Sequence, residues 1–147
     1  MSADPTSLVV VDTNVLVAAT DRSRQSHDSS LAFLNTDTRR LAVTPQIVRE
    51  YLAVATRPAE VNGFGLSPRR AVENVNQFLL EMEVLSEGTA STTLLAELVV
   101  THGAGGKQIH DANVVAVALA HGADTVVTAN IRHFARFSDL IEVEELR

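Results

Sequence analysis

The sequence predicts one α/β domain with a mostly parallel central sheet flanked by helices. Short β-branched runs such as Leu8–Val11 and Thr125–Thr128 alternate with longer segments in which apolar residues recur at helical spacing. A run that is apolar throughout suits a strand buried on both faces, as in a parallel sheet. The chain of 147 residues has a typical length for a single domain. We therefore expect one domain over residues 1–147, with its core between about residues 8 and 143.

Each element of the first half is predicted from its local pattern. Pro45 suits the first turn of a helix, where its missing N–H costs no hydrogen bond. Pro58, Gly63 and Gly65 indicate a loop over residues 57–67. The expected elements are strands at residues 8–11 and 41–44, and helices at about 15–19, 26–34 and 45–56.

The second half begins with a long helix that Ser67 can cap, with Pro68 in the first helical position. The stretch from Asp111 to Ala120 is almost entirely apolar, which predicts a buried central helix that ends at Gly122. The remaining expected elements are strands at residues 83–85, 125–128 and 140–143, and a helix at 91–101.

Composition excludes several functional classes. The chain has no cysteine, which excludes a disulfide scaffold, a thiolate zinc site and a cysteine nucleophile. Its net charge of −6 gives no overall positive field for nucleic acid, and an aromatic content of 4% leaves little for base stacking. The first residues lack the pattern of a signal peptide, and no apolar run approaches the ~18 residues of a membrane span. We expect a soluble cytoplasmic protein without membrane association.

Several familiar catalytic motifs are absent or incomplete. The segment Gly103–Lys107 resembles a phosphate-binding loop, but Thr101 stands where that motif needs glycine and Gln108 where it needs serine or threonine. We interpret the segment as a connection between two helices. The histidines show no zinc spacing, and no nucleophile-elbow motif supports a serine hydrolase.

Two polar residues directly follow predicted strands. Asp12 follows the first strand, and Asn130 follows the strand at residues 125–128. Ligands of open parallel sheets bind beyond the carboxyl ends of the strands, which makes both residues candidates for function. The structural alternatives are that Asp12 caps the next helix and that Asn130 occupies a turn.

Two further carboxylates belong to predicted helices. Glu50 is three residues after Ile47 and four before Val54, so it shares the apolar stripe of its helix. A carboxylate there needs a charged partner, a hydrogen bond or a metal. Alternatively, Glu50 lies at the edge of the stripe and reaches water, or it pairs with a nearby arginine. Asp111 begins the apolar helix, where it could simply be the N-cap.

Considered together, these four residues predict a metal site. They belong to four different elements, whose ends can meet at one edge of a parallel sheet. Three carboxylates in one cleft repel each other unless a cation neutralises them. Oxygen ligands without His or Cys suit Mg²⁺ or Mn²⁺ rather than Zn²⁺. Such a cation binds phosphate oxygens, and it can acidify a bound water into a nucleophile and stabilise an in-line displacement.

Four segments of the chain resemble the motifs of the PIN-domain family. They are Val11–Leu16, Pro45–Leu52, Ile109–Ala116 and Thr128–Phe134, which contain Asp12, Glu50, Asp111 and Asn130 in that order. The ordered resemblance extends from about Val9 to Val143. The compact size favours the VapC branch of the family, the toxins of VapBC toxin–antitoxin pairs.

The resemblance implies a three-layer PIN-like fold and a Mg²⁺-dependent endoribonuclease, commonly a homodimer, that a cognate antitoxin inhibits. It assigns Asp12 and Asp111 as metal ligands, and Glu50 as the residue that completes the metal site or positions water. The fourth motif departs from the family, because many relatives have an Asp where this chain offers Asn130 and His133. Asn130 can orient a water or a ligand but supplies no charge, so we expect one firmly bound Mg²⁺.

Arg22, Arg24, Arg39 and Arg40 could form a basic rim near the cleft, a solvated surface, or a site for an acidic antitoxin tail. RNA would then be recognised through backbone contacts and shape. Two other functions stay open from the sequence. One is a Mg²⁺ phosphatase, although Asn14 replaces the second Asp of its Asp-x-Asp motif. The other is a PIN-like RNA- or protein-binding module that has lost catalysis.

Overall fold

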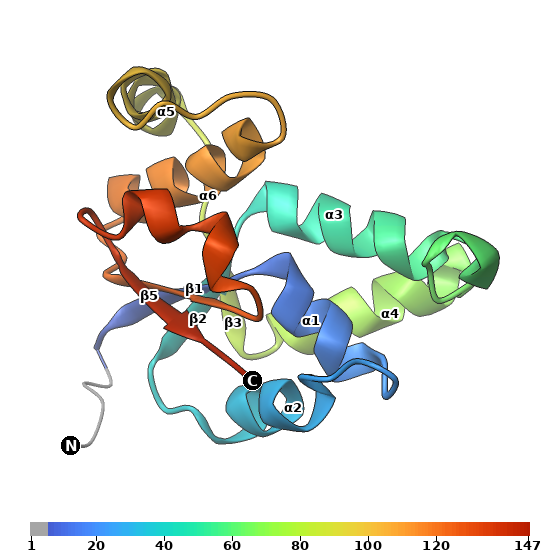
Figure 1. The fold of residues 1–147 in the computed structure, drawn as a ribbon. Coiled ribbons are helices and arrows are strands. Elements are labelled where there is room, and N and C mark those ends of the chain that lie inside the picture. The colour runs from blue at the N-terminus through green and yellow to red at the C-terminus, as the bar shows by residue number, and fades with distance from the viewer. Residues whose placement is uncertain (1–5) are drawn as a thin grey trace.

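The computed structural model describes residues 6–147 and contains a five-stranded sheet in which all neighbouring strands are parallel (Figure 1). The strand order is β3-β2-β1-β4-β5. The strands are β1 (Leu8–Val11), β2 (Arg40–Val43), β3 (Met82–Val84), β4 (Thr125–Thr128) and β5 (Glu142–Glu145). The predicted α/β fold with a parallel sheet flanked by helices is confirmed.

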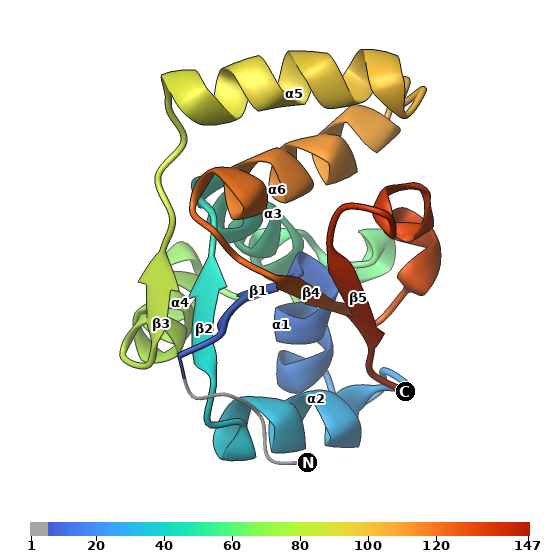
Figure 2. The ribbon, with the colours of Figure 1, turned by 90° about the vertical axis from the view of Figure 1, so that its left-hand side faces the viewer.

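The helices lie on both faces of the sheet. They are α1 (Thr13–Thr20), α2 (His27–Thr36), α3 (Pro45–Thr56), α4 (Pro68–Leu79), α5 (Thr89–Thr101) and α6 (Gln108–Ala120), with short 3₁₀ helices η1 (Ala59–Val61), η2 (Ile131–His133) and η3 (Ala135–Phe137). Crossovers between parallel strands are right-handed, so the change of direction after β3 sends α5 and α6 to the opposite face from α1 and α2. Figures 1 and 2 show α6 on one side of the sheet and α2 on the other.

The order of the strands fixes where the chain can bind a ligand. β1 lies at the centre of the sheet, paired with β2 on one side and β4 on the other. The chain adds β2 and β3 in one direction and then returns to add β4 and β5 in the other. The winding therefore reverses between β1 and β4, and the crevice beyond their carboxyl ends is the expected ligand site of such a sheet.

The core lies where the sheet meets the helices on its two faces. All four residues of β1 are buried. Residues 114–118 of α6 are also all buried, because α6 is sandwiched between the sheet and α5 (Figure 2). The prediction of a buried central helix is thus confirmed. Within residues 6–147 no helix has both the length and the apolar character needed to cross a membrane.

The start of α6 differs from the prediction. The helix begins at Gln108 with Lys107 as its N-cap, so Asp111 lies within the first turn and is not the cap. The preceding segment, Gly103–Lys107, connects α5 to α6, as expected of a helix–helix connection. The apolar run alone could not locate the start, because the first turn of this helix is polar. The correction matters for function, since it leaves the Asp111 carboxylate without a capping role.

The last strand also differs from the prediction. β5 spans Glu142–Glu145 rather than residues 140–143, although Ile141 just before it is buried. An edge strand can carry charged residues that protect its free side, and three of the four residues of β5 are glutamates. β3 and β2 each begin one residue earlier than predicted, at Met82 and Arg40.

Arg39 and Arg40 are held in ion pairs and do not form a rim around the carboxyl edge of the sheet. Arg39 pairs with Asp37 at 2.8 Å and with Glu144 at 3.0 Å, while Arg40 pairs with Glu83 at 2.8 Å. The Arg39 guanidinium holds the pKa of Asp37 below its ordinary value. Of the alternatives for these two arginines, the structure therefore excludes a basic rim.

We expect Arg39→Gln to lower the free energy of unfolding by about 1–3 kcal/mol at pH 7, because two charge-assisted hydrogen-bond partners lose their donor. A carboxyl whose pKa is lowered in the folded state contributes stability above its unfolded pKa and loses it at lower pH. The difference between wild type and Arg39→Gln should therefore shrink below about pH 4. Urea unfolding at pH 7 and pH 3 measures both values, and a difference independent of pH would contradict this explanation.

Candidate functional site

An open cavity of about 520 Å³ brings together three of the four predicted site residues, Asp12, Glu50 and Asp111. They come from the end of β1, from α3 and from the first turn of α6. The cavity therefore lies at the carboxyl edge of the sheet, where the order of the strands places a ligand. His133, which follows β4, lines the same cavity.

Asp12 is fixed by hydrogen bonds to both of its carboxylate oxygens. The backbone N–H of Thr13 donates to Oδ1 at 2.8 Å, and the buried hydroxyl of Thr128 donates to Oδ2 at 2.9 Å. The residue is only 7% exposed. Asp12 is the N-cap of α1, which confirms the capping interpretation, and it also lines the cavity, where it remains a candidate for function.

Glu50 is exposed and lines the cavity, so it is not a core residue of the apolar stripe. Gln46 donates from Nε2 to Glu50 Oε1 at 2.7 Å, and the Thr13 hydroxyl donates to Oε2 at 3.5 Å. Within the described part of the chain Glu50 forms no ion pair. The alternative in which Glu50 lies at the edge of the stripe and reaches water is therefore correct.

Gln46 is a positioning residue that sequence reasoning missed. Its side chain is 5% exposed and joins α3 to α6. Besides Glu50, its Nε2 donates to the backbone oxygen of His110 at 3.0 Å, and its Oε1 accepts from Asn113 Nδ2 at 2.7 Å. Its place four residues before Glu50 on a predicted helix was a signal, because residues at that spacing lie on the same face.

Asp111 is half-buried, and its carboxyl is a weaker acid than an exposed aspartate. The pKa of its carboxyl is raised to about 6, chiefly by burial; His133 opposes the shift, and the nearby charges of Asp12 and Glu50 add to it. A raised pKa means that the ionised carboxylate is destabilised, because the surrounding residues do not fully neutralise its negative charge. The cavity therefore favours a positively charged occupant.

Asn130 and His133 lie in the turn that follows β4. Asn130 is the N-cap of η2, where its Oδ1 accepts from the backbone of Arg132 at 3.2 Å, and its Nδ2 lies 3.3 Å from His133 Nε2. His133 Nδ1 lies 3.8 Å from Asp12 Oδ2, a distance for electrostatic attraction rather than a hydrogen bond. The Asp12 carboxylate raises the pKa of His133, and Asp111 and Glu50 add to this effect.

The structure thus separates Asn130 from the three carboxylates. Asn130 lines a neighbouring cavity rather than the acidic one, whereas His133 lines both. Sequence reasoning named His133 beside Asn130 in the fourth motif but gave it no role, because the histidines show no zinc spacing. The three-residue separation of His133 from Asn130 in one turn was the signal that could have identified it.

Basic side chains lie around the acidic cavity and around an adjoining cavity, although the chain as a whole is negatively charged. Arg24 and Arg57 line the acidic cavity. The adjoining cavity shares Glu50 and Asp111 with it and is lined by Lys107, Arg132 and Arg136. Of the arginines considered from the sequence as a rim, only Arg24 is among them. Local positive charge can therefore guide a polyanion to a site that the net charge does not favour.

The three carboxylates match a divalent cation in the chemistry of their donor atoms. As they are placed, no group of three His, Asp or Glu side chains within residues 6–147 is close enough together to hold a metal ion. The Glu50 side chain is exposed, whereas Asp12 is buried and accepts a hydrogen bond at each carboxylate oxygen. Oxygen donors around one cavity, with a carboxyl that resists ionisation, fit Mg²⁺ or Mn²⁺ better than Zn²⁺.

We expect Asp111→Asn to stabilise the metal-free protein by about 1 kcal/mol at pH 7, after allowance for solvent around a half-buried group. Because the pKa of Asp111 is raised on folding, its ionisation opposes folding as the pH rises through about 6. The gain should vanish near pH 4, where the wild-type carboxyl is protonated when folded. Urea unfolding in EDTA at both pH values measures it.

The matched control for this prediction is Glu97→Gln, because Glu97 is an exposed carboxylate on α5. Its replacement should change stability by less than about 0.5 kcal/mol at either pH. A loss of stability in Asp111→Asn at pH 7 would show instead that Asp111 supports the start of α6 and is not electrostatically strained.

Comparison with known proteins gives one family. The family model of the PIN domain matches residues 9–140. A comparison with curated proteins finds no significant match. Among solved structures, VapBC2 from Rickettsia felis, bound to a promoter DNA fragment, has a chain that is 19% identical with a TM-score of 0.69, and the match covers 95% of this chain and 99% of that one.

Two other solved structures are similar. A chain of DNA-bound VapBC from Salmonella typhimurium is 24% identical with a TM-score of 0.67, covering 95% of this chain and 98% of that one. VapC20 from Mycobacterium tuberculosis, described as a toxin that cleaves the sarcin–ricin loop, is 16% identical with a TM-score of 0.63, covering 80% and 86%. At these identities the structures support the fold, and the family model covers most of the sequence. The chain belongs to the PIN-domain family.

Proposed function

We propose that this protein is a Mg²⁺-dependent endoribonuclease and the toxin of a type II toxin–antitoxin pair. The observation that carries the proposal is the convergence of Asp12, Glu50 and Asp111 on one cavity at the carboxyl edge of the sheet. The basic side chains around this cavity suit a polyanionic substrate. The proposal includes a cytoplasmic location and a homodimer.

Asp12, Asp111 and Glu50 would hold the cation, with Mn²⁺ as an alternative to Mg²⁺. When bound, Mg²⁺ supplies a positive charge for phosphate oxygens and lowers the pKa of water. Asp12 offers a fixed ligand because Thr13 and Thr128 already orient its two oxygens. Two lone pairs remain on each oxygen of an ionised carboxylate, so these hydrogen bonds leave room for coordination.

The chain's own residues would orient the substrate and handle the proton. Glu50 is exposed and held on one side by Gln46, so its other oxygen can accept a proton from an attacking water. His133 and the surrounding arginines would bind the phosphate backbone. The aromatic residues are mostly in the core, which leaves recognition of RNA to backbone contacts and shape.

The names of the structural relatives support the part of the proposal that makes this protein the toxin of a toxin–antitoxin pair. Two of them are VapBC structures, and VapC20 is described as a toxin that cleaves the sarcin–ricin loop. A free ribonuclease harms its own cell, so an inhibitory antitoxin is the expected partner. An arginine of that partner could pair with Asp12, Glu50 or Asp111 and compete with the cation, because a guanidinium matches a carboxylate in shape and charge.

We expect the purified protein with Mg²⁺ to cleave single-stranded RNA and to leave 5′-phosphate and 3′-hydroxyl ends, because water attacks phosphorus directly. Asp12→Asn should reduce kcat at least about 100-fold with the fold intact, since Asn retains the N-cap. Glu97→Gln should match wild type. End-group analysis of the products and circular dichroism of the variants test this. Cyclic 2′,3′-phosphate ends, or full activity in EDTA, would contradict the mechanism.

RNA binding without cleavage by wild type would support the alternative of a PIN-like binding module. That alternative has one observation in its favour, the neutral Asn130 in place of an acidic residue in the fourth motif. Phosphate release from small monoesters without RNA cleavage would support the phosphatase instead.

Expression of this chain alone should slow bacterial growth, because uninhibited RNA cleavage stops protein synthesis. Growth curves after induction of wild type, Asp12→Asn and Glu97→Gln at equal protein levels provide the measurement. Only Asp12→Asn should restore normal growth. Arrest that persists in Asp12→Asn would show that the toxicity does not come from the acidic cavity.

A further inference from the structure

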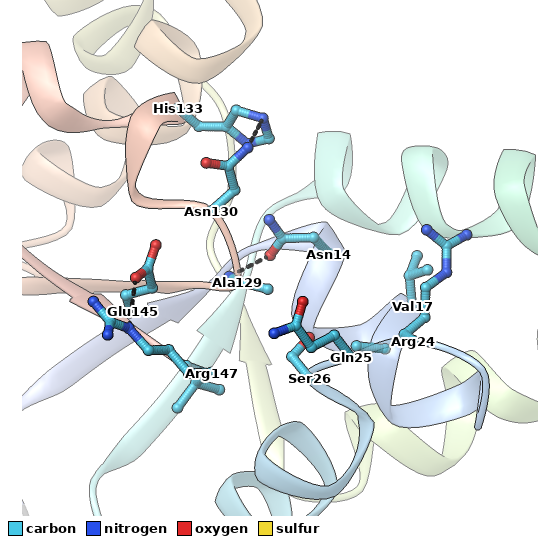
Figure 3. A pocket seen from close by; sticks show the side chains of 12 residues that line it. Asn14, Val17, Arg24, Gln25, Ser26, Ala129, Asn130, His133, Glu145 and Arg147 are labelled. Carbon is cyan, nitrogen blue, oxygen red and sulfur yellow. Dashed lines mark hydrogen bonds and ion pairs between the residues drawn. The ribbon is translucent and has the colours of Figure 1, made fainter.

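A second cavity, of about 530 Å³, adjoins the acidic one (Figure 3). It lies between the start of α1 with the α1–α2 loop on one side and the residues after β4 with the end of the chain on the other. The two cavities share four lining residues, Asn14, Val17, Arg24 and His133. They are therefore two parts of one crevice, of which only the first part contains the carboxylate cluster.

One wall of the second cavity is held in place by hydrogen bonds of the Asn14 side chain, without any ligand. Asn14 follows β1, and its Oδ1 accepts from the backbone N–H of Ala129, just after β4, at 2.9 Å. Its Nδ2 donates to the Thr128 hydroxyl at 3.1 Å. These bonds join the ends of the two strands between which the winding of the sheet reverses, and such switch points bind ligands in open α/β sheets.

The lining suits an uncharged, planar ligand group. Val17, Ala18 and Leu146 supply apolar surface, while Gln25 and Ser26 supply an amide and a hydroxyl. Within residues 6–147 neither the Gln25 amide nor the Ser26 hydroxyl has a hydrogen-bond partner. Apolar walls combined with a few free polar groups are the usual composition of a small-molecule site, and a side-chain amide can pair with the edge of a nucleobase.

The charges in this cavity compensate each other. Glu145 pairs with Arg147 at 3.1 Å and also accepts from the backbone of Ile131 at 2.9 Å. Figure 3 shows this pair across the cavity from Gln25. The second cavity therefore lacks the uncompensated negative charge of the acidic cavity, and it does not repel a nucleotide.

Arg24 lies where the two cavities meet. Its Nε is tied to Asp21 Oδ2 at 3.0 Å, which orients a side chain that is 44% exposed. Within the described residues its two terminal amino groups have no partner. Figure 3 shows the guanidinium reaching past Val17, away from Gln25. A guanidinium held at one nitrogen and free at two others can bind a phosphate bidentately.

We infer that the second cavity binds one nucleotide of the substrate strand, next to the phosphodiester at the acidic cavity. The base lies against Val17 and pairs with Gln25, and Arg24 holds the phosphate between the two cavities. This inference rests on the proposed function in taking RNA as the substrate. It assigns part of the sequence preference of cleavage to the α1–α2 loop.

Binding can be tested without metal or catalysis. 5′-Mononucleotides are titrated into isotope-labelled protein in EDTA, and backbone amide shifts are followed by NMR. At least one of the four common ribonucleotides should shift the amides of Gln25 and Ala129 in a saturable way. Arg24→Gln should weaken that affinity about 10-fold, the loss of one good phosphate contact. Arg22→Gln is the matched control, because Arg22 is exposed in the same loop and lines neither cavity.

Cleavage gives an independent test. Removing the base next to the cleaved bond, by an abasic substitution in an RNA oligonucleotide, should lower kcat/KM about 10-fold for wild type. The same substitution should have little effect on Gln25→Ala, which has already lost the contact. Circular dichroism checks that Arg24→Gln and Gln25→Ala are folded.

The two proposals fail in different ways. RNA cleavage without mononucleotide shifts at Gln25 and Ala129 would overturn this inference and leave the ribonuclease proposal standing. Shifts at these residues without any cleavage would support the nucleotide site and contradict the ribonuclease. Equal effects of Arg24→Gln and Arg22→Gln would show that only the general positive charge of the loop matters, and would also overturn the inference.

Discussion

The Thr128 hydroxyl organises the carboxyl edge of the sheet. It donates to Asp12 Oδ2 at 2.9 Å and accepts from Asn14 Nδ2 and from the backbone N–H of Asn130, each at 3.1 Å. All three partners lie within three residues of the end of β1 or β4, the strands between which the winding of the sheet reverses. Because this hydroxyl is buried, replacing it with an apolar group would leave several polar atoms unpaired. The positions of both cavities depend on this cluster of hydrogen bonds.

The electrostatics of the site oppose the stability of the metal-free fold. Three carboxylates surround one cavity, and burial raises the pKa of Asp111 to about 6. His133 offsets part of the negative charge, and Gln46 and Thr13 stabilise Glu50 by hydrogen bonds without neutralising it. Unrelieved electrostatic repulsion of this kind is common at functional sites, where charged groups are placed to bind a ligand rather than to stabilise the fold. A bound cation, or a basic group of a partner protein, would relieve it.

The sequence alone predicted the sheet, the buried helix α6 and the convergence of Asp12, Glu50 and Asp111, because each depends on local patterns and on the rules of parallel sheets. It did not predict how Glu50 is held, because Gln46 contacts α6 from a position 64 residues earlier in the chain than its partner His110. It also placed Asn130 with the carboxylates and named His133 in the same motif without giving it a role. Which of the two residues lines the acidic cavity depends on the direction of each side chain in the turn after β4. The conformation of that turn cannot be predicted from hydrophobic periodicity. The fourth motif could only indicate which segment of the chain contributes to the site.

In the proposed function, Asp12, Glu50 and Asp111 form one divalent cation site. Paramagnetic broadening of amide signals by substoichiometric Mn²⁺ tests this claim most directly, because the effect falls off steeply with distance from the bound ion and needs no substrate. We expect selective broadening of Thr13, Asp111 and His133 that excess Mg²⁺ reverses, with α5 unaffected, and loss of the broadening in Asp12→Asn. Broadening centred elsewhere, or unchanged in Asp12→Asn, would show that these three carboxylates do not form the cation site.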